Sequence, residues 1–599
     1  MHLNGWIFIK YLKHFLFKFY IMEFLDWFVL GTFFILLIGI VIWVVMQKDE
    51  TSEDYFLAGR NAGWIAIGTS IFASNIGSEH LVGLAGAGAA NGMAMAHWEM
   101  QGWIILVLGW VFVPFYDRIK ILTMPEYLEK RFSTSSRTFL SVISLVSYVL
   151  TKVAVTVYAG GVVFKEVFGI ESFLGIDFFW IGAIGLVVIT GLFTVFGGMK
   201  AVLYTSVLQT PILLIGSLAI LFIGLDQLGG WGELMRICSE HTTPYGDPMT
   251  SLMRSSSDPD FPWTGVILGS AIIGFWYWCT DQYIVQRVLS GKDVKNARRG
   301  TIFGAYLKLL PIFIFLIPGM IAFALHQKGL LNLTSADAAF SIMVSNILPV
   351  GLKGVVVGGI IAALMSSLAS LFNSSAMLFT VDFYQKIKPD APEKELVTIG
   401  RIATVVIVIL GVLWIPVMKS IGSVLYAYLQ DVQSLLAPGI AAVFLLGVLW
   451  RKTTAQASIT GLVTGFVIGM SRLGLKVFAD ALDQNGIVYQ VMVAPNWLHF
   501  EIALFFLILA VMIIVTFATH GDNYSLETEE EEYLEQGEGQ VVLSSPAGTK
   551  QKLKPGRGLT VWDSSPEQKE ENRKTWDKWD VVHSIVIVAI TLFIYIYFF

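Results

Sequence analysis

A polar interruption stands inside an otherwise apolar segment near the start of the chain. Residues 73–80 read ASNIGSEH, whereas the flanking residues from Trp64 to Leu84 are mostly apolar. A membrane helix must satisfy its own backbone, and irregular backbone at membrane depth is tolerated only where it lines a cavity. The stretch therefore predicts a broken helix that turns carbonyl oxygens, such as those of Ala73 and Ile76, toward a cavity.

A second group of oxygen-bearing residues is spaced so that its members share one face of a helix. Ala363, Ser366 and Ser367 stand at i, i+3 and i+4 in the sequence AALMSSLASLFNSS. Together with two carbonyl oxygens of the broken helix, they would form a five-oxygen pocket without a carboxylate. Neutral oxygen ligands suit a hard, singly charged cation. The alternative is that the serines bond their own backbone or allow close helix packing.

Several ionisable or amide side chains also fall within apolar segments. Each is costly in a membrane and is therefore a functional hypothesis. A carboxylate, an ammonium, an imidazole and an amide beside aromatic rings could bind a polyhydroxylated ligand, although Glu99 and Lys308 could also simply pair with each other. The polar residues are His80, Glu99, Lys152, Lys308 and Gln430, and the aromatic ones are Trp98, Tyr277 and Tyr426.

A second interruption lies about five spans later, where the aromatic run FWYWCTDQY meets Thr280, Asp281 and Gln282. Interrupted segments at corresponding places in two halves indicate the midplane binding site of a transporter. We therefore expect two halves of five spans each, with the two interruptions facing one site.

The composition is that of a polytopic membrane protein. Of 599 residues, 55% are hydrophobic and 14% are charged, and the mean hydropathy is +0.68. Apolar runs long enough to cross a bilayer predict about fourteen membrane-spanning helices in an all-α fold. They are 25–46, 64–84, 93–115, 138–164, 177–196, 202–224, 262–285, 301–325, 340–380, 398–418, 421–449, 455–475, 499–519 and 580–599.

The distribution of lysine and arginine predicts the orientation. If the N-terminus lies outside, the basic loops 116–137, 286–300, 384–395 and 450–456 all lie inside. We expect four regions: an N-terminal extension over 1–21, which is not native if translation starts at Met22; a transmembrane core over 22–519; a charged cytoplasmic loop over 520–579; and a final helix over 580–599.

Five long motifs occur in order between about Asp54 and about Thr454. They are DYFLAGRNAGWIAIGTSIFASNIGSEHLVGLAGAGAANGMA, TMPEYLEKRF, WYWCTDQYIVQRVLS, YLKLLPIFIFLIPGM and MSSLASLFNSSAMLFTVDFY. With these motifs the chain resembles the sodium/glucose cotransporters of the sodium:solute symporter family. The resemblance implies the inverted five-helix repeat of the leucine transporter, with flanking helices.

The resemblance also implies a role for individual residues. The sodium site of the family falls on Ala73, Ile76, Ala363, Ser366 and Ser367. The sugar site falls on His80, Glu99, Lys308 and Gln430, with Tyr277 as inner gate, and Lys152 and Thr151 match a contact from the third helix. Asn75 matches an asparagine that bonds the gate tyrosine, and Leu84 and Tyr426 match outer gate positions.

Three positions depart from the family pattern. Gly274 stands where an Asn or Thr often contacts the sugar, which predicts one hydrogen bond fewer to the substrate. Ser206 and Ala369 replace residues that belong to a second sodium site in members that have one. We therefore expect one sodium ion per substrate molecule.

These features predict a transporter and not an enzyme. We expect sodium-coupled symport of a glucose- or galactose-like sugar by alternating access across the plasma membrane, or the inner membrane in a bacterium. A myo-inositol or other polyol symporter is the first alternative, and a membrane solute sensor is the second. The expected partners are the sugar or polyol, sodium and the lipid bilayer, with no nucleic acid and no obligate protein partner.

Overall fold

A computed structural model gives the structure of the chain. It describes residues 22–47, 51–77, 79–168, 170–242, 246–421, 425–519, 541–544, 550–553, 559–564 and 566–599. The expected extension over 1–21 and much of the expected loop over 520–579 lie outside the described residues.

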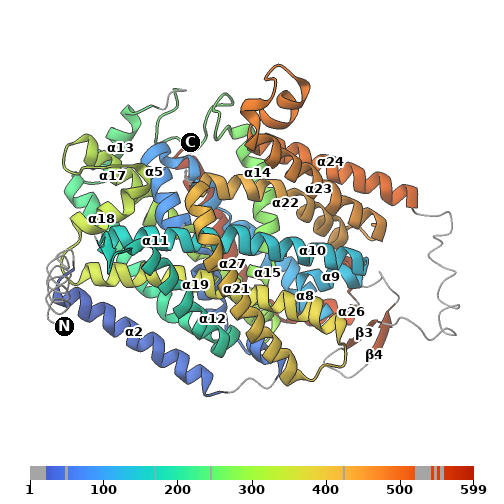
Figure 1. The fold of residues 1–599 in the computed structure, drawn as a ribbon. Helices are drawn as coiled ribbons and strands as arrows, with labels where there is room; N and C mark the ends of the chain where they lie inside the picture. Colours follow the sequence, from blue (N-terminus) through green and yellow to red (C-terminus); the bar gives the residue numbers. More distant parts are fainter. Residues whose placement is uncertain are drawn as a thin grey trace.

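Helices account for nearly all of the described chain (Figure 1). Those of the first half are α2 (Phe24–Val45), α3 (Ser52–Leu57), α4 (Trp64–Asn75), α5 (Ala85–Asn91), α6 (Ala96–Glu99), α7 (Gly102–Val107), α8 (Val113–Ile119), α9 (Met124–Arg131), α10 (Thr134–Ser147), α11 (Ala154–Phe168), α12 (Phe178–Leu228) and α13 (Trp231–Glu240).

The second half begins with α14 (Trp263–Phe275), α15 (Gln282–Leu289), α16 (Val294–Pro311), α17 (Ile317–Gln327), α18 (Ala339–Ile347), α19 (Leu352–Met377) and α20 (Gln385–Ile387). It continues with α21 (Glu393–Ile421), α22 (Leu425–Leu449), α23 (Ala455–Val477), α24 (Trp497–Thr519), α26 (Pro566–Lys574) and α27 (Lys578–Tyr597).

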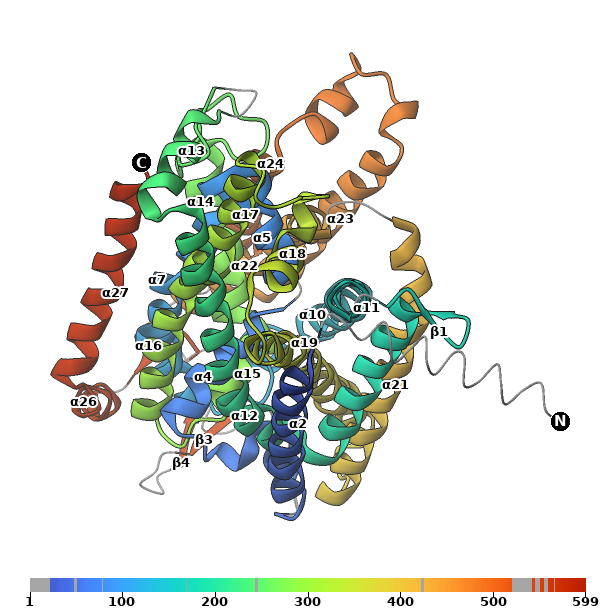
Figure 2. The same ribbon diagram turned by 90° about the vertical axis from the view of Figure 1, so that its left-hand side faces the viewer.

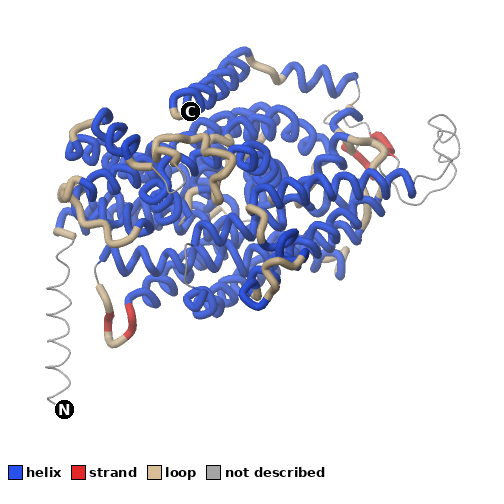
Figure 3. The backbone as a smooth tube through the Cα atoms, turned by 90° about the horizontal axis from the view of Figure 1, so that it is seen from above, coloured by secondary structure: helices blue, strands red, loops and turns tan. Residues whose placement is uncertain are grey.

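Short π-helical segments join several of these helices into longer rods. They are Glu79–Leu84, Leu108–Phe112, Tyr148–Val153, Trp276–Thr280, Ile312–Leu316, Leu378–Tyr384 and Tyr489–Val493. Two small antiparallel hairpins, β1 (Ser172–Phe173) with β2 (Ile176–Asp177) and β3 (Val541–Ser544) with β4 (Lys550–Leu553), lie at the margins of the helical body (Figure 3). The predicted all-α class is confirmed.

Among the described residues, ten helical segments are long and apolar enough to span a membrane. One of them, α12, covers two of the expected spans, because the chain bends at Gly198 (φ 50°) without interrupting the helical run. A side chain at Gly198 would also approach the backbone oxygen of Tyr55 to 2.5 Å. The count of fourteen spans stays a prediction.

Helix α19 forms the centre of the bundle, and each of its residues from Val356 to Met377 is buried. It packs against α2, α12 and α21, while α4 packs against α16, and α22, α23 and α24 pack against one another. Figure 2 shows α21 along one margin and α27 along the opposite one, where α27 contacts α7 and α16. The described part of the chain is thus a layered helical bundle around α19 and α4.

Candidate functional site

The predicted break after α4 is present. Helix α4 ends at Asn75, Ile76 has extended dihedral angles (φ −78°, ψ 112°), and helical structure resumes at Glu79 as a π-helix. A residue in this conformation leaves the helical hydrogen-bonding pattern, so nearby carbonyl groups become available to other partners. Ser78 lies outside the described residues.

The second predicted break lies at Asp281. The π-helix Trp276–Thr280 stops there, Asp281 is extended (φ −79°, ψ 125°), and α15 follows. Its carboxylate caps α15 by accepting a hydrogen bond from the Tyr283 backbone N–H at 3.2 Å, which satisfies one of the open donors of that helix. Both interrupted segments are therefore confirmed.

A polar cavity of about 50 Å³ lies between the two breaks. It brings together six residues predicted from the sequence as substrate or gate positions: Asn75, His80, Glu99, Tyr277, Lys308 and Gln430. Trp98, one of the aromatic residues noted beside them, also lines it. Sequence reasoning did not assign Glu79, Gln101, Ile273, Trp278 or Gln433 to the site. The signal for Glu79 was its place in the polar stretch beside His80.

The charged groups of the cavity form a chain. The Lys308 Nζ atom lies 2.7 Å from Glu99 Oε2, and Glu99 Oε1 lies 3.4 Å from His80 Nε2. The Asn75 amide Nδ2 lies 3.3 Å from the same imidazole nitrogen. Glu99 and Lys308 therefore form an ion pair, which was the alternative to a substrate-binding role. Both residues nevertheless line the cavity.

Three buried polar atoms of this wall have no hydrogen-bond partner among the described residues. They are His80 Nδ1, Trp98 Nε1 and Gln430 Oε1. A buried polar atom without a partner is costly, so such atoms in a cavity wall suit a ligand that offers hydroxyl groups. Aromatic surfaces stand beside them, including Tyr277, Trp98 and Trp278. This combination of hydrogen-bonding groups and flat rings can bind a polyhydroxylated ring.

Gln101 occupies the space next to Gly274. A Cβ atom added at Gly274 would lie 2.9 Å from the Gln101 side-chain carbonyl carbon. Gln101 Nε2 donates to the Ser270 carbonyl at 2.8 Å, and its Oε1 accepts from Trp278 at 2.9 Å. A side chain from α14 at position 274 has no room while Gln101 holds this position.

Lys152 does not line the cavity. Its ammonium lies 2.6 Å from Asp281 Oδ2, and the Tyr148 hydroxyl donates to the other oxygen of this carboxylate. The Lys152 Nζ atom also lies 4.8 Å and 4.7 Å from the ring centroids of Tyr277 and Tyr283. We name these five residues, Tyr148, Lys152, Tyr277, Asp281 and Tyr283, the tyrosine cluster.

The other predicted gate residues have different surroundings. Leu84 is completely buried in the π-helix after the break. Asn75 contacts His80, and no hydrogen bond joins it to Tyr277 among the described residues. Tyr426 lies in α22, but its side chain, like that of Thr151, is outside the described residues.

A cluster of neutral oxygens lies where the first break meets α19. The Ser367 Oγ atom lies 3.0 Å from the carbonyl oxygens of both Ser74 and Ile76. Ser366 Oγ lies 3.4 Å from the Ser206 hydroxyl on α12. Ala73 and Ala363 are buried in the packed region that α4 shares with α19. The predicted helix faces do meet, and the chemistry of this oxygen set fits a singly charged cation. Ser74 is an addition that the sequence did not single out.

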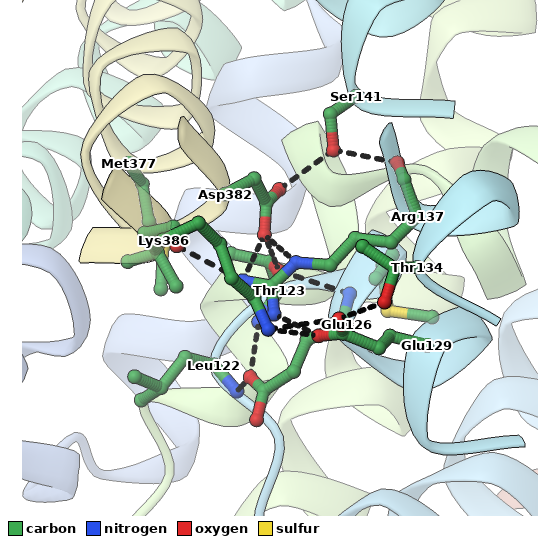
Figure 4. A network of polar contacts seen from close by, with 12 residues as sticks. Leu122, Thr123, Glu126, Glu129, Thr134, Arg137, Ser141, Met377, Asp382 and Lys386 are labelled. Atoms are coloured by element: carbon green, nitrogen blue, oxygen red, sulfur yellow. Dashed lines mark hydrogen bonds and ion pairs between the residues drawn. The ribbon is translucent and has the colours of Figure 1, made fainter. Parts of the chain in front are cut away.

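A salt-bridge network lies on the predicted cytoplasmic side (Figure 4). The buried Asp382 carboxylate accepts from Thr123 Oγ1 at 2.8 Å and from Arg137 Nε at 2.8 Å. Arg137 also pairs with Glu129, which Lys386 approaches to 2.6 Å. Burial opposes ionisation of Glu129, but hydrogen bonds from Lys386, Arg137 and Thr134 lower its pKa to about 2.

A C-terminal strap, residues 559–564 and 566–577, crosses the same side. Arg118 Nη2 donates to the Thr560 carbonyl at 2.6 Å, and Arg451 pairs with Asp563 at 2.7 Å. Farther along, Arg298 Nη2 donates to Asn572 at 3.0 Å, and Arg299 pairs with Asp577 at 2.8 Å. The strap therefore joins the ends of α8, α16 and α22.

The two broken helices, the cavity between them and the surrounding bundle define a membrane transporter. The sodium:solute symporter family model matches residues 55–465, and the chain belongs to this family. It is thus a multi-pass membrane symporter rather than an enzyme, and the family implies sodium as the co-transported ion.

Two relatives show the extent of the sequence similarity. The chain is 36% identical over 523 residues to the sodium/glucose cotransporter 4 of Danio rerio, covering 82% of this chain and 78% of that protein. It is 37% identical over 527 residues to the sodium/myo-inositol cotransporter 2 of Mus musculus, covering 83% and 77%.

The fold is shared with a solved structure of a Na⁺-coupled sialic acid symporter in a substrate-bound outward-open state. The TM-score is 0.70 at 21% identity, and the match covers 83% of this chain and 98% of that one. The predicted leucine-transporter-like core, with its broken helices, is confirmed.

Proposed function

We propose that this protein couples the entry of a glucose- or galactose-like monosaccharide to the entry of sodium across the plasma membrane, by alternating access and with its N-terminus outside. The observation that carries the proposal is the break after α4. The same short segment presents the Ser74 and Ile76 carbonyl oxygens to Ser367 and the His80 imidazole to the polar cavity. The 36% identity to a sodium/glucose cotransporter supports the choice of cargo.

Sodium is held by the carbonyl oxygens of Ala73, Ile76 and Ala363 and the hydroxyls of Ser366 and Ser367. The 3.0 Å contact of Ser367 Oγ with the Ile76 carbonyl oxygen supports this assignment. The equal contact of Ser367 with the Ser74 carbonyl oxygen places Ser74 beside the proposed ion. An ion bridging α4 and α19 fixes the break, and so it orders His80 before the sugar arrives. By linkage, the sugar must tighten sodium binding by the same factor.

The sugar hydroxyls bond His80, Glu99, Lys308 and Gln430, and the Tyr277 ring closes the cavity toward the cytoplasm. The His80 Nδ1 and Gln430 Oε1 atoms, which have no hydrogen-bond partner among the described residues, support this arrangement. Lys152 acts on the substrate through the tyrosine cluster, because its ammonium is held by Asp281. Leu84 closes the cavity on the outer side, and the outer-gate role of Tyr426 stays a prediction from the sequence.

One sodium ion per sugar gives sufficient driving force. A tenfold sodium gradient supplies about 1.4 kcal/mol, and 100 mV of membrane potential adds about 2.3 kcal/mol. Together they would concentrate the sugar roughly 500-fold, since each decade costs about 1.4 kcal/mol. Ser206 supports this stoichiometry, because a second sodium site would need a carboxylate at this position. The Ser206 side chain is a neutral hydroxyl that donates to the Val202 carbonyl at 2.6 Å.

A cyclic polyol such as myo-inositol is the second candidate cargo. The Glu79 carboxylate in the cavity wall favours it, because a carboxylate only accepts hydrogen bonds and a cyclitol offers a hydroxyl at every ring carbon. The similarity to a sodium/myo-inositol cotransporter also supports this candidate.

Uptake into liposomes tests the proposal. Purified protein is given radiolabelled glucose, galactose or myo-inositol under an inward sodium gradient, and then under an equal potassium gradient. Accumulation with sodium alone identifies both the coupling and the cargo. Equal accumulation with either ion, or none with any of the three solutes, would contradict the proposal.

A further inference from the structure

Helix α15 touches both the oxygen cluster and the tyrosine cluster. Tyr283 and Arg287 stand at i and i+4, so their side chains share one face of the helix. Both reach Ser74, the residue whose carbonyl lies beside Ser367. The Tyr283 hydroxyl donates to the Ser74 carbonyl, and Arg287 Nε donates to the Ser74 hydroxyl at 2.9 Å.

The ring of Tyr283 faces the tyrosine cluster at the same time. The Lys152 ammonium lies 4.7 Å from its centroid, and the Tyr277 ring lies 6.2 Å away. The Tyr283 backbone N–H donates to the Tyr148 hydroxyl at 3.2 Å. A single side chain therefore contacts the backbone of the proposed ion site through its hydroxyl and the proposed gate through its ring.

Arg287 brings a fixed positive charge to this region. Its guanidinium is completely buried and lies 5.0 Å from the Tyr283 ring centroid. Its two terminal nitrogens have no hydrogen-bond partner among the described residues. Asp281, the acidic member of the tyrosine cluster, pairs with Lys152. A cation that binds beside Ser74 therefore lies close to a buried guanidinium, and like charges repel strongly in a buried environment.

We propose that Tyr283 and Arg287 transmit the occupancy of the sodium site to the inner gate. An ion that draws the Ser74 and Ile76 carbonyl oxygens toward α19 changes the acceptor of the Tyr283 hydroxyl and the position of the Arg287 guanidinium. The Tyr283 ring then shifts against Lys152 and Tyr277. Both are positioning residues, which act through Ser74 on the ion and through the cluster on the substrate. The inference rests on the sodium-coupled transport proposed above.

The coupling factor is the direct test, because a merely structural role would not change it. It is the ratio of the dissociation constants for the radiolabelled substrate in potassium and in sodium, measured on the full chain with whichever of glucose, galactose or myo-inositol the wild type accumulates. Tyr283→Phe removes the hydroxyl and keeps the ring. We expect the factor to fall about fivefold, as for the loss of one buried hydrogen bond.

Tyr116→Phe is the matched control. Its hydroxyl donates to the Cys279 carbonyl at 2.6 Å, in the same broken helix but away from Ser74, so the coupling factor should stay at the wild-type value. Arg287→Lys keeps the charge but loses the Nε donor to Ser74, and it should also lower the factor. It supplies the same measurement if Tyr283→Phe does not fold.

Different results would overturn the coupling role of Tyr283 and Arg287 and the proposed sodium-coupled transport. If Tyr283→Phe and Arg287→Lys both keep the wild-type coupling factor, the inference is overturned but the proposed function is not. A wild-type protein whose substrate affinity is equal in sodium and potassium would overturn the proposed function, and the inference with it.

Discussion

Lys152 and Asp281 form a buried ion pair, 2.6 Å apart, between the π-helix Tyr148–Val153 and the break that precedes α15. The side chains of Lys152 and Asp281 are 9% and 3% exposed. Sequence reasoning placed Lys152 near the substrate, whereas the structure places its charge on the residue that ends the aromatic run. The pair therefore joins these two segments beside the Tyr277 ring, whose centroid lies 4.8 Å from the Lys152 Nζ atom.

Lys152→Met should destabilise the protein strongly, because it leaves the Asp281 carboxylate buried without its counter-ion. Removing one partner of a buried pair costs about 3–5 kcal/mol. The double variant Lys152→Met/Asp281→Asn should recover much of this loss. A double-mutant cycle compares the thermal unfolding of the wild type, Lys152→Met, Asp281→Asn and the double variant. If the effects of the two single substitutions add in the double variant, the pair contributes no coupling energy.

Ser367→Ala should weaken sodium binding, because it removes the hydroxyl that contacts the Ser74 and Ile76 carbonyl oxygens. We expect the half-saturating sodium concentration to rise about tenfold, equivalent to about 1.4 kcal/mol. Sodium-dependent uptake measures it. Ser375→Ala on the same helix is the control, since the Ser375 hydroxyl is buried without a hydrogen-bond partner among the described residues. An unchanged sodium dependence in Ser367→Ala would remove Ser367 from the ion site.

Gln430→Ala should act on the sugar rather than on sodium. Its Oε1 atom has no partner in the cavity wall, so the amide is available to a substrate hydroxyl. The half-saturating sugar concentration should rise about fivefold, as for the loss of one hydrogen bond. Sodium binding measured without sugar should stay at the wild-type value. If uptake of the sugar is unaffected, Gln430 does not contact it.

The C-terminal strap should be released only when several contacts are removed. Arg451 is 60% exposed, so its pair with Asp563 alone contributes at most about 1 kcal/mol. Trp562 adds a hydrogen bond to the Leu449 carbonyl at 2.7 Å. Arg451→Ala/Trp562→Ala should therefore speed hydrogen exchange of the amides in residues 559–564 more than either single substitution does. Equal exchange in the double variant and the wild type would show that other contacts hold the strap.

Glu129 should stay ionised through the physiological pH range. Its pKa is lowered to about 2, so its contribution to stability is fully present above its ordinary pKa and is lost progressively as the pH falls from there through about 2. Glu129→Gln should therefore lower the unfolding temperature by the same amount throughout the range from about pH 5 to pH 8. A difference that vanishes toward pH 5 would mean that the carboxylate takes up a proton there.

Much of the site could be predicted because its signals are local. The stretch ASNIGSEH and the run FWYWCTDQY combine polar residues with apolar flanks, and both contain the observed breaks. Ionisable residues in apolar segments identified His80, Glu99 and Lys308, because their cost in a membrane requires an explanation.

What could not be predicted depends on partners distant in sequence. The free-energy cost of burying the Lys152 ammonium in an apolar segment indicates that it has a partner or a function. Nothing near Lys152 in the sequence identifies that partner as Asp281, which is 129 residues away. The sequence does not distinguish Ser74 from other small residues, because its contacts with Tyr283 and Arg287 appear only in the folded structure. The charged segment before the last helix has the composition of a solvated loop, yet residues 559–577 bind arginines of α8 and α16.

The C-terminal strap also has a consequence for biogenesis. Arg451 donates a hydrogen bond to the carbonyl of Trp562, 111 residues downstream. Arg118 donates one to the carbonyl of Thr560, 442 residues downstream. Because domains begin to fold during synthesis, the helices of the core can insert and pack before the ribosome has made these partners. The strap contacts are then among the last to form, and a nascent chain whose strap has not yet emerged leaves Arg118, Arg298 and Arg451 available to other acceptors.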